Sequence, residues 1–202
     1  MKIVVAILSI FILALMFTLF YYNPYLTGNT IESGNLTTTG LTIDDLGELR
    51  HWDHMPLSYN YSNEEECFPI RISRAELALN EIERLTENQV YFVFTESDAD
   101  ISFVCSRESF VNVVDRTETL GEAEVEYNLE RKVITSAKIN LYSGVPEECN
   151  YPDIEIHELL HALGEGHNTH TQSVMNVVQQ KCLKSINMNV DGVIFERLKD
   201  TY

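Results

Sequence analysis

Three histidines and a glutamate between residues 157 and 167 have spacings that suit a catalytic metal. His157 and His161 are four residues apart, so on a helix both side chains project from one face and can reach one ion. Glu158 lies beside them, and Gly164 follows His161 by three residues, where a left-handed turn could end the helix and reverse the chain. His167 could then approach the same ion from the far side.

These residue types can activate water. Three neutral imidazoles leave zinc its double charge and one open coordination position, and water bound there has a pKa of about 7. Glu158 is placed to accept the proton of that water and to deliver it to a departing amine. The sequence therefore predicts one catalytic Zn²⁺ with His157, His161 and His167 as ligands and Glu158 as general base. His170 could compete as a ligand, but the spacing favours His167.

The pattern HExxHxxGxxH followed by a methionine resembles the metzincin metallopeptidases. Within that clan, the segment from His157 to Met175 is most similar to the matrixins, and Trp52 to Tyr59 resembles their first strand. The resemblance implies that Met175 forms the Met-turn, an apolar floor under the metal. Asn168 and Asn176 depart from the usual matrixin residues, so the specificity pocket is not predicted. Calcium, common in matrixins, cannot be assigned because no loop shows its ligand spacing.

The same resemblance implies an α+β (mixed α/β) metzincin-like zincin domain over residues 51–202. We expect a twisted, mostly parallel sheet of about five strands and three helices. In metzincins an antiparallel edge strand binds the extended substrate, and residues 122–130 could supply that strand. An ordinary solvated hairpin is the alternative for this segment.

Local patterns predict the positions of several elements. A capping box at Ser73–Glu76 predicts a helix that starts there and runs to about residue 88. The zinc-binding helix should start near Tyr151, with Pro152 at an early position, and end at Gly164. Runs and alternating patterns of β-branched and apolar residues predict strands at 90–95, 100–105 and 133–141. An apolar stripe of Val190, Val193, Ile194 and Leu198 predicts a last helix at 189–199.

The four cysteines suggest an oxidising compartment. Cys67, Cys105, Cys149 and Cys182 are even in number and allow three pairings, which the sequence alone does not distinguish. Free buried thiols are the alternative. If the matrixin topology applies, the C-terminal ends of two parallel neighbouring strands bring Cys67 to Cys105, and Cys149 then pairs with Cys182.

The N-terminal segment predicts a membrane anchor. No charged side chain occurs from Ile3 to Tyr22, and about 20 apolar residues span a bilayer core. We therefore expect a transmembrane signal anchor at residues 1–22 and a flexible stalk at residues 23–50. Lys2 precedes the segment and no Lys or Arg follows it before Arg50, which places the catalytic domain on the extracytoplasmic side of the cell membrane. A cleaved signal peptide and a secreted product are the alternative.

Composition limits the partners. The net charge of -17 and the lack of Lys/Arg clusters argue against nucleic acid. The sequence thus predicts a single-pass, membrane-anchored zinc endopeptidase that acts on peptides or proteins as a monomer. The alternative is a non-catalytic zinc-containing surface module for adhesion or partner binding, although such a module has no use for Glu158.

Overall fold

The computed structural model describes residues 50–62, 67–106, 110–111, 118–142, 150–176 and 182–202. The chain divides into two compact units, Met1–Asn35 and Leu36–Tyr202, and every described residue belongs to the second. The predicted anchor at residues 1–22 lies outside the described residues, and so does the predicted stalk up to residue 49. In the part of the chain that is described, no helix is long and apolar enough to cross a membrane.

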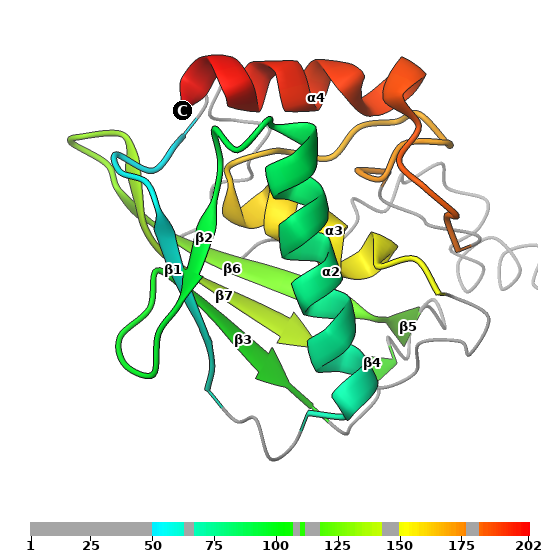
Figure 1. The fold of residues 1–202 in the computed structure, drawn as a ribbon, viewed down its shortest axis with the longest axis horizontal. Helices are drawn as coiled ribbons and strands as arrows, with labels where there is room; N and C mark the ends of the chain where they lie inside the picture. Colours follow the sequence, from blue (N-terminus) through cyan, green and yellow to red (C-terminus); the bar gives the residue numbers. More distant parts are fainter. Residues whose placement is uncertain (1–49, 63–66, 107–109, 112–117, 143–149, 177–181) are drawn as a thin grey trace, which may run out of the picture. The chain divides into compact units, whose positions relative to one another are not determined.

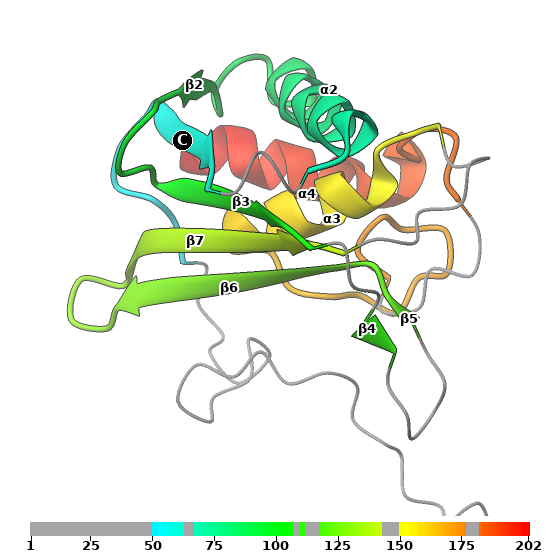
Figure 2. The ribbon, with the colours of Figure 1, turned by 90° about the horizontal axis from the view of Figure 1, so that it is seen from below.

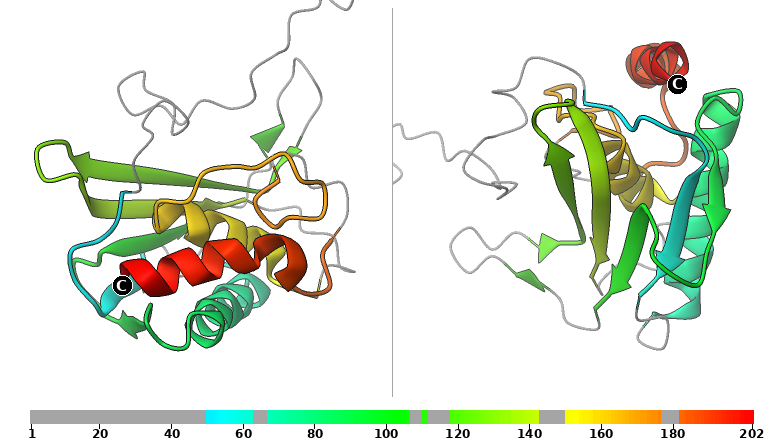
Figure 3. Two further views of the ribbon diagram at one scale, coloured as in Figure 1. Left: turned by 90° about the horizontal axis from the view of Figure 1, so that it is seen from above. Right: turned by 90° about the vertical axis from the view of Figure 1, so that its left-hand side faces the viewer.

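A five-stranded sheet forms the centre of the described domain, with strand order β2-β1-β3-β7-β6 (Figure 1). Its strands are β1 (Leu57–Tyr61), β2 (Phe92–Phe94), β3 (Ile101–Cys105), β6 (Gly121–Asn128) and β7 (Val133–Leu141). All neighbours pair in parallel except β6, which is antiparallel to β7. The predicted mostly parallel sheet is confirmed, and its strands twist relative to one another (Figure 3). Two short strands, β4 (Phe110–Val111) and β5 (Glu118–Thr119), pair separately.

Three helices occur among the described residues: α2 (Pro69–Leu85), α3 (Asp153–Ala162) and α4 (Met188–Thr201). Figure 2 shows all three on one face of the sheet. The predicted start of the first helix was wrong. That helix begins at Pro69 after the N-cap residue Phe68, because proline fits the first helical position, whose N–H needs no partner. Ser73, the predicted cap, lies inside the helix one turn later.

Alternating inward side chains of the strands build the core against these helices. Ile101, Phe103 and Cys105 of β3 are buried, as are Ala123 and Val125 of β6. Each large apolar side chain in such a position stabilises the fold by about 1.5–3 kcal/mol. The stripe predicted for the last helix was partly wrong, because Val193 is 65% exposed whereas Phe195 is completely buried.

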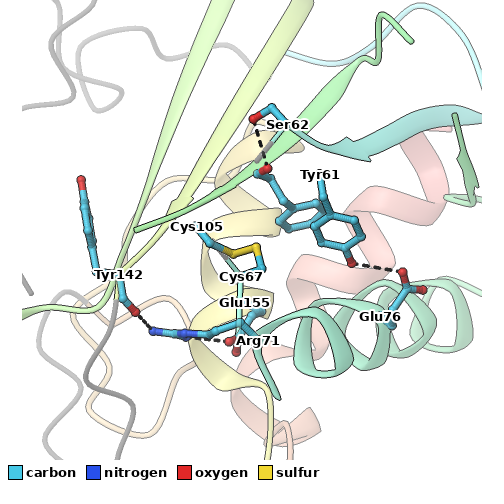
Figure 4. Close-up of a disulfide and its surroundings, with 9 residues drawn as sticks. Tyr61, Ser62, Cys67, Arg71, Glu76, Cys105, Tyr142 and Glu155 are labelled. Carbon is cyan, nitrogen blue, oxygen red and sulfur yellow. Dashed lines mark hydrogen bonds and ion pairs between the residues drawn. A yellow bond between two sulfur atoms is a disulfide. The ribbon is translucent and has the colours of Figure 1, made fainter. Parts of the chain in front are cut away.

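The disulfide between Cys67 and Cys105 links the two parallel strands as predicted (Figure 4). Its Cα atoms are 5.0 Å apart. Cys67 follows β1, Cys105 ends β3, and the two strands pair directly. Cys182 is also disulfide-bonded, whereas its predicted partner Cys149 lies outside the described residues. No described cysteine is a free thiol.

A buried ionic cluster, which the sequence analysis did not predict, joins α2 to the start of α3. Arg71 Nη1 lies 2.8 Å from Glu155 Oε1, and Arg74 Nη2 lies 2.9 Å from Glu155 Oε2 and 3.3 Å from Asp153 Oδ1. Arg71 also donates to the carbonyl oxygen of Tyr142 (Figure 4) and to that of Leu120. The cluster therefore fixes α3 relative to α2 and to the start of β6.

The segment before β1 packs against the C-terminal end of α3. Trp52 is buried, and its Nε1 donates to the Ala162 carbonyl oxygen at 2.9 Å, which satisfies one of the orphan carbonyls at the helix end. The Trp52 amide donates to the Tyr202 hydroxyl at 3.1 Å. His51 pairs with Val133 as an isolated bridge. This segment thereby joins the sheet, α3 and the end of α4.

Candidate metal centre

Helix α3 positions two of the three predicted histidines and the predicted base. Its apolar residues Ile156, Leu159 and Leu160 are buried, so the helix is held on the inside of the domain. Because His157 and His161 are four residues apart, they lie on one face, with ring centroids 4.6 Å apart. The helix begins at Asp153, two residues later than predicted.

Gly164 reverses the chain after α3, as predicted from the sequence. Its φ is +96°, in the left-handed region that glycine adopts without strain. The Glu165 amide donates to the Leu160 carbonyl oxygen and the Gly164 amide to that of His161, each at 2.9 Å, which is the Schellman pattern. A Cβ at Gly164 would collide with the Arg50 carbonyl oxygen. The turn brings His167 back toward the helix.

The three imidazoles converge through their Nε2 atoms. His161 Nε2 lies 3.0 Å from His157 Nε2 and 3.1 Å from His167 Nε2, and the remaining distance is 3.3 Å. A tetrahedral zinc ion with Zn–N bonds of about 2.0–2.1 Å holds its nitrogen ligands roughly 3.3 Å apart. The donor set and its spacing therefore fit zinc. In the described ranges, this is the one group of three or more His, Cys, Asp or Glu side chains close enough to share an ion.

Backbone carbonyl oxygens fix the orientation of two of the rings. Val174 O lies 2.6 Å from His157 Nδ1, and Glu165 O lies 2.8 Å from His161 Nδ1. Because a carbonyl only accepts, Nδ1 must donate, which leaves the lone pair of Nε2 directed at the cluster. Burial lowers the pKa of His157 to about 4 and holds the pKa of His161 well below its ordinary value. Both rings are therefore neutral at physiological pH, as metal ligands must be.

Glu158 is buried between the histidines and the sheet, with 6% of its surface exposed. Burial raises the pKa of its carboxyl to about 8, and the charges of Glu122 and Glu155 act in the same direction. A hydrogen bond with the Ala123 backbone partly opposes this increase. A carboxyl with such a pKa can both take up and release a proton near neutral pH.

The turn at Ser173–Asn176 lies next to the cluster and contains Met175, which is completely buried. The backbone N–H of Asn168 donates to the Met175 carbonyl oxygen at 2.9 Å, so the residue after His167 is bound to this turn. Asp191 of α4 accepts from the Ser173 hydroxyl at 2.5 Å and from the Val174 amide at 3.2 Å. The turn therefore presents the Val174 carbonyl to His157 from a fixed position.

Two residues that support the site were missed in the sequence. Asp191 is completely buried, and the available signal was a lone acid within the apolar stripe of the last helix. Glu165 is 2% exposed and pairs with Arg197 of α4 through both carboxylate oxygens. That pair holds the loop whose carbonyl orients His161. The sequence offered no comparable signal for it, because Glu165 lies in a turn, where acids are common.

The other histidines lie outside the cluster. His170 is exposed, and its Nδ1 accepts from the Gln172 amide at 3.2 Å. His54 is exposed and lies between Asp53 and Asp100, which raise its pKa. His51 is half-buried, and its backbone pairs with Val133 of the sheet.

Strand β6 lies at the edge of the sheet, next to Glu158. The Tyr142 amide donates to Leu120 O, so residues 122, 124 and 126 direct their backbone groups at β7 in an antiparallel ladder. Residues 121, 123 and 125 therefore direct theirs away from β7, where no described strand pairs with them. The expected antiparallel edge strand is thus present at Gly121–Asn128.

No protein-family model matches this chain, and no curated protein matches it. Among solved structures, the chain is similar to high choriolytic enzyme 1, a hatching enzyme zinc-protease from Oryzias latipes, the medaka fish. The identity is 20% and the TM-score is 0.36, and the match covers 61% of this chain and 51% of that one. The chain thus spans about half the length of that enzyme. Similarity at this level transfers no activity, so the functional conclusion must come from the side chains themselves.

Proposed function

We propose that this chain is a zinc-dependent endopeptidase of the metzincin type, with a matrixin-like catalytic domain at residues 51–202. The observation that carries the proposal is the convergence of three imidazole Nε2 atoms within 3.0–3.3 Å of one another. Metal ligands would be His157, His161 and His167. In the described ranges no fourth His, Cys, Asp or Glu joins this group, and an open position is typical of a catalytic rather than a structural zinc.

Each group of the chain then has a task. Zinc at this position would supply Lewis-acid activation of water and of the scissile carbonyl. Glu158 takes a proton from the attacking water and passes it to the departing nitrogen. The outward backbone groups of Gly121 and Val125, together with the outward carbonyl of Ala123, bind an extended peptide by strand addition. Because backbone groups make these contacts, binding of this kind accepts many sequences.

We propose further that the enzyme acts outside the cell as a monomer, anchored by residues 1–22 through the stalk at 23–50. The uncharged run from Ile3 to Tyr22 supports the anchor, and the Cys67–Cys105 disulfide supports an oxidising compartment. N-terminal sequencing and alkaline extraction of cell membranes test this. A mature chain that starts beyond residue 22 and stays in solution would mean a secreted product instead.

The activity is tested with the full-length chain in detergent, using casein and a quenched peptide with and without a zinc chelator. Wild type should cleave both substrates and lose activity with the chelator. Glu158→Ala should bind zinc equally and lose activity by about 10²–10⁴-fold. If wild type binds zinc but cleaves neither substrate, the chain is a non-catalytic surface module.

A matched pair of histidine variants tests the ligand set. His167→Ala should lose bound zinc, measured by elemental analysis after dialysis, because it removes one of the three converging donors. His170→Ala removes an exposed imidazole three residues away and should keep its zinc. The reverse result would show that the ligand set is wrong.

A further inference from the structure

Gly121, the first residue of β6, lies directly against the proposed base. A Cβ built at this glycine would lie 2.8 Å from Glu158 Cγ, 2.9 Å from Glu158 Oε1 and 3.0 Å from Ile154 Cγ2. Ordinary contacts between carbon atoms are about 3.5–4.0 Å. Both neighbours come from α3 and both are buried, with 6% of Glu158 and 7% of Ile154 exposed. The space that a side chain would need at Gly121 is therefore already filled by the helix that carries the base.

The backbone gives no reason for a glycine at this position. Gly121 has no positive φ of the kind that strains other residues, unlike Gly164. The backbone of an alanine could adopt the same φ and ψ angles without strain. Alanine would also lower the conformational entropy of the unfolded chain. The requirement for glycine therefore comes from the neighbouring side chains alone.

The surroundings leave the strand and the helix little room to move apart. Arg71 donates to the Leu120 carbonyl oxygen at 3.3 Å and to Glu155 Oε1 at 2.8 Å, so one buried side chain ties the residue before Gly121 to the turn of α3 before Glu158. A backbone hydrogen bond from Ala123, two residues further along β6, also holds the Glu158 carboxyl. A methyl group at residue 121 would therefore push mainly on the Glu158 side chain.

We propose that Gly121 is a positioning residue for Glu158. The missing side chain sets where the carboxyl lies between α3 and the edge strand. This inference rests on the proposed peptidase function, because it assigns Gly121 a role through the base. Gly121 itself touches neither the metal ligands nor, through a side chain, the substrate.

The kinetic test compares Gly121→Ala with wild type, using the full-length protein loaded with zinc. We expect kcat to fall by about tenfold or more, since small displacements of a catalytic group are costly, while KM stays within about twofold. Zinc content should not change. Gly192→Ala is the matched control, because a Cβ there meets only Met188 Cε at an ordinary 3.8 Å, and its kcat should equal that of wild type. An unchanged kcat in Gly121→Ala, or a loss of zinc, would overturn the proposal.

A double-mutant cycle tests the contact without any activity. Gly121→Ala should lower the melting temperature, and the decrease should shrink or disappear when Glu158 is already alanine, because the clashing side chain is gone. An equal decrease in both backgrounds would contradict the proposal. If Gly121→Ala alone does not fold, recovery of folding in the double variant supports it and failure of both refutes it. An inactive wild type combined with a clear coupling would refute the peptidase function while keeping the contact between residues 121 and 158.

Discussion

Successive turns of α3 bury carboxylates in different ways. At its start, Asp153 and Glu155 lie against the guanidinium groups of Arg71 and Arg74. One turn later Glu158 is equally enclosed, but the causes of its pKa shift include no cation: burial and the charges of Glu122 and Glu155 raise the pKa to about 8. Partners compensate the first two charges inside the protein. The third has no cation among the causes of its shift, and strongly perturbed pKa values of this kind cluster at functional sites.

Carboxylates with and without arginine partners therefore have different roles on the same helix. A buried carboxylate with bidentate arginine partners fixes how elements pack. A buried carboxylate without a cation costs stability whenever it ionises, and such groups are concentrated at functional sites. The comparison can therefore be tested by removing charges from each of these turns.

The largest effect should follow from removing the cation at the start of α3. Arg74→Met keeps most of the side-chain volume but leaves Asp153 without its arginine and Glu155 with Arg71 alone. We expect a loss of about 3–5 kcal/mol in the free energy of unfolding, because breaking a buried pair leaves an uncompensated charge. Urea unfolding followed by tryptophan fluorescence measures it. A loss below about 1 kcal/mol would mean that water compensates the carboxylates.

Removing the uncompensated charge should have the opposite sign. Glu158 has a folded-state pKa of about 8 against an ordinary 4.5, so ionisation costs the zinc-free protein stability as pH rises from 4.5 to 8. Glu158→Gln should therefore change little at pH 4.5 and stabilise the zinc-free protein by roughly 1–3 kcal/mol at pH 8. Melting temperatures in chelator at both pH values measure this gain.

Glu155→Gln is the matched comparison one turn earlier on the same helix. It leaves Arg71 without its carboxylate partner, so it should destabilise the protein at both pH values. If both glutamine variants change stability in the same direction at pH 8, the contrast between the two turns of α3 is wrong.

The smallest effect is expected at an exposed arginine pair on α2. Arg84 Nε lies 2.8 Å from Glu81 Oε2, but its side chain is 64% exposed. Arg84→Ala should change the free energy of unfolding by no more than about 0.5 kcal/mol, because solvent and salt screen such pairs. Comparison of Arg84→Ala with Arg74→Met shows how much of the loss in the free energy of unfolding depends on burial of the arginine. A loss of similar size in the two variants would remove burial as the explanation.

Much of the site was predictable because its spacing is local. His157 and His161 share a face of any helix, and Gly164 suits a left-handed turn wherever a helix ends. Strand β7 was predicted with its correct bounds, since Val, Thr, Ala, Ile and Leu alternate along it on one face. The start of α2 was not, because the capping box at Ser73 competes with Pro69, and the proline determined the N-terminus.

The sequence by itself determined the donor set, its helical spacing and the turn after it, since these depend on 3.6-residue periodicity and on the conformations open to glycine. Only the tertiary structure decided which carbonyl orients each imidazole, which buried carboxylate receives an arginine, and which glycine lies against Glu158. Those choices join residues far apart in the chain. They depend on packing between elements, which no local pattern encodes.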